Sequence, residues 1–309
     1  MTSILTNMAA MSALQTLRTI GSDMQETQSR VSSGLRVGAA ADNAAYWSIA
    51  TTMRSDNMAL SAVSDALGLG ASKVDTAYAG MESALEVVKE IKAKLVAATE
   101  QGVDKQKIQE EVKQLQDQIK SIAQSATFSG QNWIMGEAAD KTVVSGFTRD
   151  SANAVAVRST TYTLNDALDG NVLFTSIDAD GVGAGGILGT EGTASGLIMI
   201  EMNVASDIDY EDSTADNYIG NVIQDIDDAV RYMTSAGAEL GSISMRINLQ
   251  EDFVNKLSDS LESGIGRLVD ADMNEESTRL KALQTQQQLA IQSLSIANSS
   301  SEVILSLFR

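Results

Sequence analysis

The sequence YWSIATTMRSDNMALSAVSDALGLGASKVDTAYAGMESALEVVKEIKAKLVAA, residues 46–98, repeats apolar residues at unbroken intervals of seven. The repeating positions are Tyr46, Met53, Leu60, Leu67, Val74, Met81, Val88 and Leu95. A second line of mostly small residues runs beside them at Ile49, Asp56, Val63, Gly70, Ala77, Ala84, Ile91 and Ala98. This repeat predicts a coiled-coil-like helix, and the small residues let a neighbouring helix approach closely. At ~1.5 Å per residue, residues 43–99 would form a rod of about 85 Å.

Two further helices complete the predicted bundle. A turn at residues 101–103 precedes Asp104, which is placed to cap a helix whose apolar residues alternate spacings of four and three. The short connection makes this helix antiparallel to the first. A third helix is predicted over 217–268, where eight apolar residues from Ile219 to Leu268 again lie seven apart. Its phase breaks at residues 263–266, and Asp272 then begins a capping arrangement for a new helix.

Both ends of the chain are amphipathic helical sequences that need a partner. The apolar residues of the first end include Leu17, Met24 and Val31, which lie seven apart, preceded by Ile4, Met8 and Met11. The last end carries two such lines, Leu289, Ile296 and Val303, and Leu283, Ala290, Ala297 and Ile304. A seven-residue apolar seam must be covered by another helix. Two such ends therefore indicate a protein that assembles with copies of itself.

The segment between the helical regions differs in composition. Residues 136–216 are rich in Gly, Asp, Ser and Thr, with short β-prone runs at 141–147, 154–157, 171–177 and 196–204. The fold class expected is mainly α, a long helical bundle with a small β-rich inserted outer domain. The expected divisions are a terminal helical core (1–42 and 265–309), a helical rod (43–135 and 217–264) and the insert (136–216).

Composition excludes several classes of function. The chain has no cysteine and no histidine, which removes thiol chemistry, the commonest metal ligand and the usual general base near pH 7. Its net charge is −19, with no basic stripe to neutralise phosphates, so we expect no nucleic-acid partner. No apolar run approaches the ~18–20 residues that span a bilayer, and no secretory signal is expected at the N-terminus. We therefore predict no catalytic residue, no metal site and no cofactor.

Three local motifs resemble ligand or modification sites but are better explained otherwise. The glycine-rich run 181–186 fits a dinucleotide-binding pattern, yet no helix is predicted to open there, so a flexible turn is the better interpretation. Asp178 and Asp180 resemble the start of a calcium loop that lacks its later ligands, which favours a solvated turn. Asn298 begins a formal glycosylation motif that falls on the predicted terminal helix, so chance is the better explanation.

The segment SSGLRVGAAADNAA, residues 32–45, connects the terminal helix to the rod. One interpretation is a helix break followed by a cap at Asp42. The other is a tight inter-subunit spoke, in which the Ala/Gly run lets backbones approach and Arg36 pairs with a carboxylate. The residues alone leave both interpretations open.

This segment, followed by SIA at 48–50, resembles the N-terminal signature of bacterial flagellins. The stretches ADMNEES (271–277), the Gln-rich 284–288 and VILSLFR (303–309) resemble the other end of the family, and TFSGQNW (127–133) matches at the close of the second rod helix. The resemblance covers roughly 1–135 and 217–309, and the sequence around Tyr46 and Trp47 is similar to the alphaproteobacterial branch.

The resemblance implies a structural, non-enzymatic subunit of the helical flagellar filament, secreted and extracellular. Terminal helices would line an inner tube, rods an outer tube, and the variable insert the surface. Implied partners are further copies, other flagellins in a mixed filament, the export apparatus with its flagellin chaperone, and the cap and hook-junction proteins, with no nucleic acid and no membrane. Flagellins are exported unfolded, and their termini order only on polymerisation.

Residues and resemblance together predict a polymerisation interface spread over both ends of the chain. Its members are Ile4, Met8, Met11, Leu14, Leu17, Met24, Val31, Leu35, Arg36, Asp42, Asn43, Leu283, Leu289, Ile296, Val303, Ile304, Leu307 and Arg309.

The resemblance also implies a segment of the kind that an animal innate immune receptor recognises, over residues 88–99. Glu90 stands where that receptor contacts an arginine, and Lys92 stands where the family carries another basic residue, with Leu95 in the same segment. A negative charge in place of a positive one predicts poor activation of the receptor.

Three other functions fit this sequence less well than a filament subunit does. A hook–filament junction protein shares flagellin-like termini but forms a short collar, which electron microscopy distinguishes from long filaments. A coiled-coil surface adhesin would need an anchor or an export signal. An enzyme carried in the insert has no nucleophile or histidine to support it.

Overall fold

The computed structural model describes residues 7–150, 154–178 and 182–306, and the side chains of residues 300–306 lie outside that description. The chain divides into two compact units, Met1–Met58 with Ser258–Arg309 (unit 1) and Ala59–Leu257 (unit 2). The helices are α1 Met8–Ser33, α2 Ala44–Ala98, α3 Lys105–Ser125, α4 Gly186–Gly189, α5 Ile219–Val269 and α6 Met273–Ser306. The strands are β1 Thr127–Phe128, β2 Gln131–Asn132, β3 Asp140–Arg149, β4 Val155–Thr163, β5 Ser176–Ile177 and β6 Gly183–Ala184.

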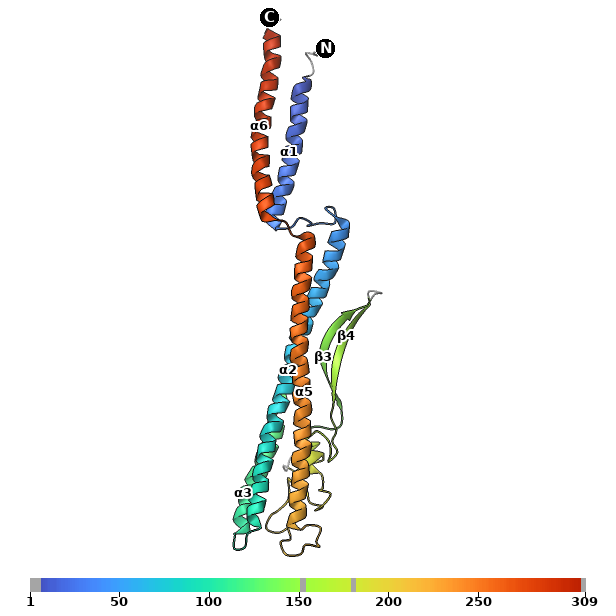
Figure 1. Ribbon diagram of the computed structural model, residues 1–309, viewed down its shortest axis with the longest axis vertical. Helices are drawn as coiled ribbons and strands as arrows, with labels where there is room; N and C mark the ends of the chain where they lie inside the picture. The colour runs from blue at the N-terminus through green and yellow to red at the C-terminus, as the bar shows by residue number, and fades with distance from the viewer. Residues whose placement is uncertain (1–6, 151–153, 179–181, 307–309) are drawn as a thin grey trace. The chain divides into compact units, whose positions relative to one another are not determined.

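In unit 2 the predicted heptad seams form the core. Both lines of α2 are buried from Leu60 to Ala98, and the line of α5 is buried from Ile219 to Val254. The two helices run side by side in opposite directions, and Ser244 Oγ donates a hydrogen bond to Asp75 Oδ1 across them at 2.8 Å (Figure 1). The periodicity therefore predicted both the helices and the faces that they bury.

Helix α3 follows the predicted turn and packs beside α2 (Figure 1). Asp104 caps it, because its Oδ1 accepts a hydrogen bond from Gln106 N at 3.1 Å, as the sequence predicted. The apolar face of α3, which includes Ile119, is buried. An ion pair of 2.6 Å joins Lys94 of α2 to Glu111 of α3.

The regular β structure of the middle segment consists mainly of one antiparallel hairpin, β3–β4, with a bulge between Val144 and Gly146. This hairpin explains Gly70 of α2, where a Cβ would lie 2.1 Å from Val143 Cγ1. The small residue was expected to admit a neighbouring helix, but it admits a strand. Strands were correctly predicted around 141–147 and 154–157. Residues 171–177 form only a short strand at Ser176–Ile177, and 196–204 form none.

The rest of the middle segment packs onto the bundle through side chains of the helices. The amide of Gln116, buried on α3, donates hydrogen bonds to the carbonyls of Met199 and Met202 at 3.0 and 3.2 Å. On α5, the carboxylate of Asp225 accepts hydrogen bonds from Ser195 N and Ser195 Oγ at 2.7 and 2.6 Å. These helix side chains satisfy part of the loop backbone, and hydrogen bonds within the segment, such as that from Ile200 N to the Leu188 carbonyl, satisfy other groups without a strand.

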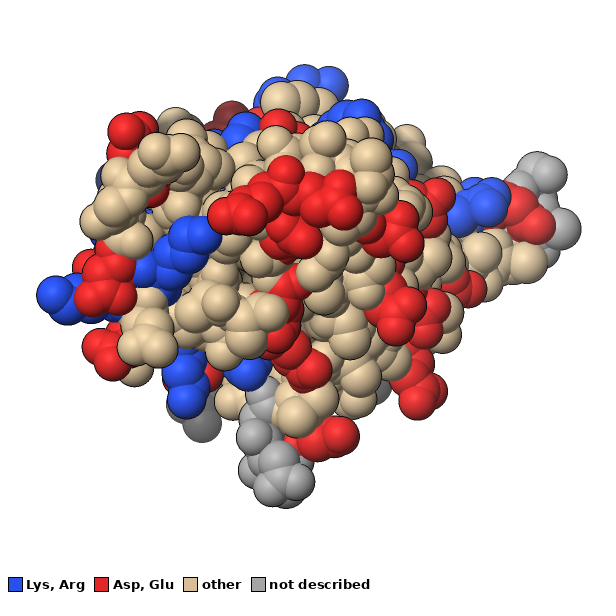
Figure 2. Space-filling model, turned by 90° about the horizontal axis from the view of Figure 1, so that it is seen from below, with Lys and Arg blue, Asp and Glu red and all other residues tan. Residues whose placement is uncertain are grey.

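Acidic side chains are widespread on the face shown in Figure 2, which agrees with the negative net charge. The helix predicted over 217–268 is confirmed, because α5 runs from Ile219 to Val269 through the phase break at 263–266. Within this stretch, a Cβ at Gly264 would lie 2.9 Å from Met53 Cε in unit 1.

Candidate functional site

The terminal helices α1 and α6 form an antiparallel pair in unit 1, with the first residues of α1 and the last residues of α6 at the same end of the pair (Figure 1). The side chains buried along this pair are few: Ala10, Ile20 and Thr27 on α1, and Glu276 and Leu283 on α6. The predicted line Leu17, Met24 and Val31 is only half-buried beside them. Pairing within one chain therefore leaves much of the predicted apolar surface uncovered.

The two heptad lines of α6 have different surroundings. Leu283 is buried, Ala290 and Ala297 are half-buried, and Asn7 Nδ2 donates a hydrogen bond to the Ala297 carbonyl at 2.9 Å. This line therefore faces α1. In the other line, Leu289 and Ile296 are 63 % and 69 % exposed. The outward line has no cover within the described part of the chain.

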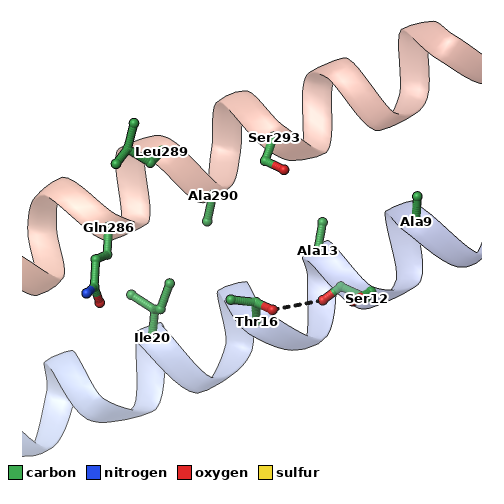
Figure 3. A pocket seen from close by; sticks show the side chains of 9 residues that line it. All are labelled: Ala9, Ser12, Ala13, Thr16, Ile20, Gln286, Leu289, Ala290 and Ser293. Carbon is green, nitrogen blue, oxygen red and sulfur yellow. Dashed lines mark hydrogen bonds between the residues drawn. The ribbon is translucent and has the colours of Figure 1, made fainter.

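A groove with a volume of about 700 Å³ runs between the two helices. Ala13, Thr16 and Ile20 of α1 point toward α6 across it, and Thr16 Oγ1 donates a hydrogen bond to the Ser12 carbonyl at 3.1 Å (Figure 3). Large apolar side chains remain exposed on both helices: Met8, Met11, Leu14, Leu289, Ile291 and Ile296. A concentration of exposed apolar side chains of this kind marks a protein–protein interaction site.

The connection from α1 to α2 is held against the end of α5. Leu35 forms a bridge with Asp270, and the backbone N–H groups of Arg36 and Val37 donate hydrogen bonds to the Val269 carbonyl at 2.7 and 3.1 Å. The Arg36 guanidinium donates to the Leu268 carbonyl at 3.2 Å, where a cation complements the negative end of a helix. Arg36 thus binds helix carbonyls within this chain, and an inter-subunit carboxylate partner stays a prediction.

The helix cap that the sequence suggested at Asp42 is made by the next residue, Asn43, and Asp42 binds its own loop instead. Asp42 Oδ2 accepts hydrogen bonds from Gly38 N and Ala39 N, both at 2.9 Å, and these bonds hold the pKa of Asp42 below its usual range. The cap of α2 is Asn43, whose Oδ1 accepts a hydrogen bond from Tyr46 N at 3.1 Å. The prediction of a cap at Asp42 was wrong, because that side chain folds back onto its own loop.

Several predicted interface residues cannot be placed. Ile4, Leu307 and Arg309 lie outside the described residues, and so do the side chains of Val303 and Ile304 on α6. Asp180 and Gly181 of the dismissed motifs also fall outside them.

Sequence reasoning missed an ionic contact between α1 and α6 in unit 1. Arg30 Nη1 lies 3.3 Å from Glu276 Oε1, and the Glu276 side chain is only 7 % exposed. Nothing in the spacing of either helix pairs these two residues, because the register between segments 246 positions apart is a tertiary property.

The receptor-like segment lies on α2 in unit 2. Glu90 is exposed, and Lys92 forms an ion pair with Asp227 of α5. Leu95 is fully buried in the helical seam, so the structure removes it from any surface that another protein could contact.

The described residues contain no group of three or more His, Cys, Asp or Glu side chains placed to hold a metal ion. Among the helices in those ranges, none combines the length and apolar character needed to cross a bilayer. Within the glycine-rich run, the described residues form strand β6 at Gly183–Ala184 and then a packed turn: at Gly186, with φ of +70°, a Cβ would lie 2.7 Å from the Leu173 carbonyl oxygen. The only helix that opens at these glycines is the four-residue α4.

Comparison with known proteins matches both ends of the chain. The model of the bacterial flagellin N-terminal helical region matches residues 4–139, and that of the C-terminal helical region matches residues 223–308. The chain is 53 % identical to Flagellin B and 51 % identical to Flagellin C of Rhizobium meliloti, and 44 % identical to a flagellin of Brucella melitensis. Each of these alignments covers 100 % of both chains.

Proposed function

Because this chain belongs to the bacterial flagellin family and is a structural subunit of the extracellular flagellar filament, we propose that its paired terminal helices are the surface through which copies join. The observation that carries this proposal is the exposure of large apolar side chains after α1 and α6 have paired. Met8 and Ile296 remain 70 % and 69 % exposed, one on each helix. Burying such side chains against neighbouring copies supplies the driving force for polymerisation.

The charges of the terminal segments support close packing of copies. Residues 1–40 contain three basic and two acidic residues, whereas residues 140–220 contain 13 acidic and three basic residues. Near-neutral helices can approach their copies, while the acidic middle segment repels its neighbours and belongs in water. We propose accordingly that 1–42 and 265–309 line an inner tube, that 43–135 and 217–264 form an outer tube, and that 136–216 face the surface.

The further partners proposed are those of an exported filament subunit. They are other flagellins in a mixed filament, the flagellar export apparatus with a flagellin chaperone, and the cap and hook-junction proteins. The chain has no cysteine and no proline, so neither disulfides nor slow X–Pro isomerisation would hinder threading and refolding. The hook–filament junction alternative gains no support, because the full-length relatives are named flagellins.

Deletion of residues 295–309 tests the proposal directly. The truncated chain should retain the helical circular dichroism of unit 2 and fail to polymerise, because the deletion removes Ile296 and the end of α6 that pairs with Asn7. Normal filaments of the truncated chain in electron micrographs would contradict the proposed mechanism. Long filaments of the full chain, as opposed to short collars, would separate a filament subunit from a junction protein.

The receptor hypothesis is part of the same proposal. An exposed Glu90 opposes an acidic receptor surface, so purified monomer should activate a receptor reporter poorly, and Glu90→Arg should activate it more strongly. Full activation by the unmodified monomer at ordinary flagellin doses would rule this out.

A further inference from the structure

The seam between α1 and α6 carries a polar contact near each of its ends. At one end, Asn7 Oδ1 caps α1 by accepting a hydrogen bond from Ala10 N at 3.0 Å, while Asn7 Nδ2 donates to the Ala297 carbonyl at 2.9 Å. At the other end, Arg30 Nη1 donates to Glu276 Oε1 at 3.3 Å. Because the helices are antiparallel, these contacts bracket most of the length over which the helices pair.

The carboxylate of Glu276 is buried and depends on Arg30. Its Oε2 is inaccessible to solvent and accepts no hydrogen bond within the described part of the chain. Arg30 also contacts Glu26 Oε1 at 2.5 Å, and Arg279 Nη1 lies 3.8 Å from Glu276 Oε1. A buried carboxylate that loses its cation is strongly destabilising. Sliding α6 by one heptad would move Glu276 about 10 Å along α1 and separate it from Arg30.

Between the two polar contacts, the large apolar side chains buried in the described seam are Ile20 on α1 and Leu283 on α6. The other facing residues are mostly small or polar, among them Ala13 and Thr16 on α1 and Ala290 and Ser293 on α6 (Figure 3). Repeated small side chains bury similar surfaces after a shift of one heptad, so apolar packing discriminates weakly between registers. Single polar residues are known to specify register in helical seams of this kind.

We propose that Arg30, Glu276 and Asn7 are positioning residues that fix the register of α1 against α6. This inference rests on the proposed function. For copies to join, the exposed residues Met8 on α1 and Ile296 on α6 must keep a fixed position relative to each other along the helix pair. A slipped pair would present the same apolar residues out of alignment. The polar contacts therefore select one geometry of the assembly surface, while apolar burial supplies its affinity.

Introduced cysteines test the register, because the full-length chain has none of its own. The pair Ala13→Cys with Ser293→Cys reports the register of the structure, and Ala13→Cys with Gln286→Cys reports a slip of one heptad. The unlocked variant is Asn7→Asp/Arg30→Met/Glu276→Met, which keeps an acceptor to cap α1, removes the amide donor and separates only the exposed charges of Glu26 and Arg279 from these partners. The matched control is Arg18→Met/Glu275→Met, which removes one exposed charge from each helix.

Each variant is added to parent filament seeds, and disulfide formation is measured in the grown filaments. In the parent and control chains the first pair should cross-link at least about tenfold faster than the second, and this ratio should approach one in the unlocked chain. A parent-like ratio in the unlocked chain would overturn the proposal. Failure of the unlocked chain to join the seeds, while the control chain joins them, would also support the proposal, because a slipped pair presents its exposed apolar residues out of alignment. Failure of the proposed function would instead appear as assembly of the chain without residues 295–309.

Discussion

Replacement of Ile296 by serine isolates the contribution of one exposed apolar side chain to polymerisation. Ile296 lies on the outward line of α6 and is 69 % exposed, so the substitution leaves the α1–α6 pair largely undisturbed. Serine is tolerated on an exposed helix face at a cost of only a few tenths of a kcal/mol. Any larger effect must therefore come from contacts that form between copies.

The magnitude follows from the exposed fraction. Complete burial of an isoleucine side chain contributes about 1.5–3 kcal/mol, and about two-thirds of this side chain is still available for burial. Ile296→Ser should therefore weaken each subunit addition by about 1–2 kcal/mol. Because 1.4 kcal/mol is a factor of ten in an equilibrium constant, the critical concentration for polymerisation should rise about 5- to 30-fold.

Seeded polymerisation measures this change: filaments are grown to a plateau and sedimented, and the concentration of residual monomer is determined. The matched control is Val157→Ser, which replaces a β-branched residue that is 61 % exposed on β4 in unit 2. The control should change the critical concentration less than twofold. An unchanged critical concentration for Ile296→Ser, or an equal rise for Val157→Ser, would refute the assignment of the interface to the terminal helices.

Three further predictions concern the scaffold. Met81→Ala should lower the free energy of unfolding by about 2–5 kcal/mol in urea denaturation, because Met81 is 1 % exposed in the α2 seam, whereas Tyr78→Ala, at a position 41 % exposed, should cost less than half as much. Because the pKa of Asp42 is lowered, its carboxylate keeps the hydrogen bonds from Gly38 and Ala39 above about pH 4 and loses them as the pH falls through that lowered value. Hydrogen exchange of these two amides should accelerate only in that acidic range, and it should be faster at every pH in Asp42→Ala. Asp225→Ala should accelerate proteolysis within residues 186–217 while the circular dichroism of the helices is retained, and unchanged cleavage would show that the Ser195 contacts are dispensable.

The sequence predicted the helices and their buried faces correctly where a strict heptad repeat packs along its length against another helix. The lines of α2 from Leu60 and of α5 to Val254 are buried as expected, because a seven-residue repeat encodes both the helix and the face that it hides. The helix predicted over 217–268 is likewise confirmed, since α5 runs to Val269 through the phase break at 263–266. The strand predicted at 196–204 was wrong, and side chains of Gln116 and Asp225 satisfy part of the backbone of the surrounding segment.

The sequence by itself determined that both ends are helical, apolar and near-neutral, and that they need partners, because periodicity and charge are local properties. Tertiary structure decided which of the two lines on α6 is covered by α1 and which remains exposed. It also decided that Asn43 caps α2, that Asp42 closes its own loop, and that Glu276 meets Arg30. These outcomes depend on the register between segments far apart in the chain, and register is set by contacts that no single segment contains.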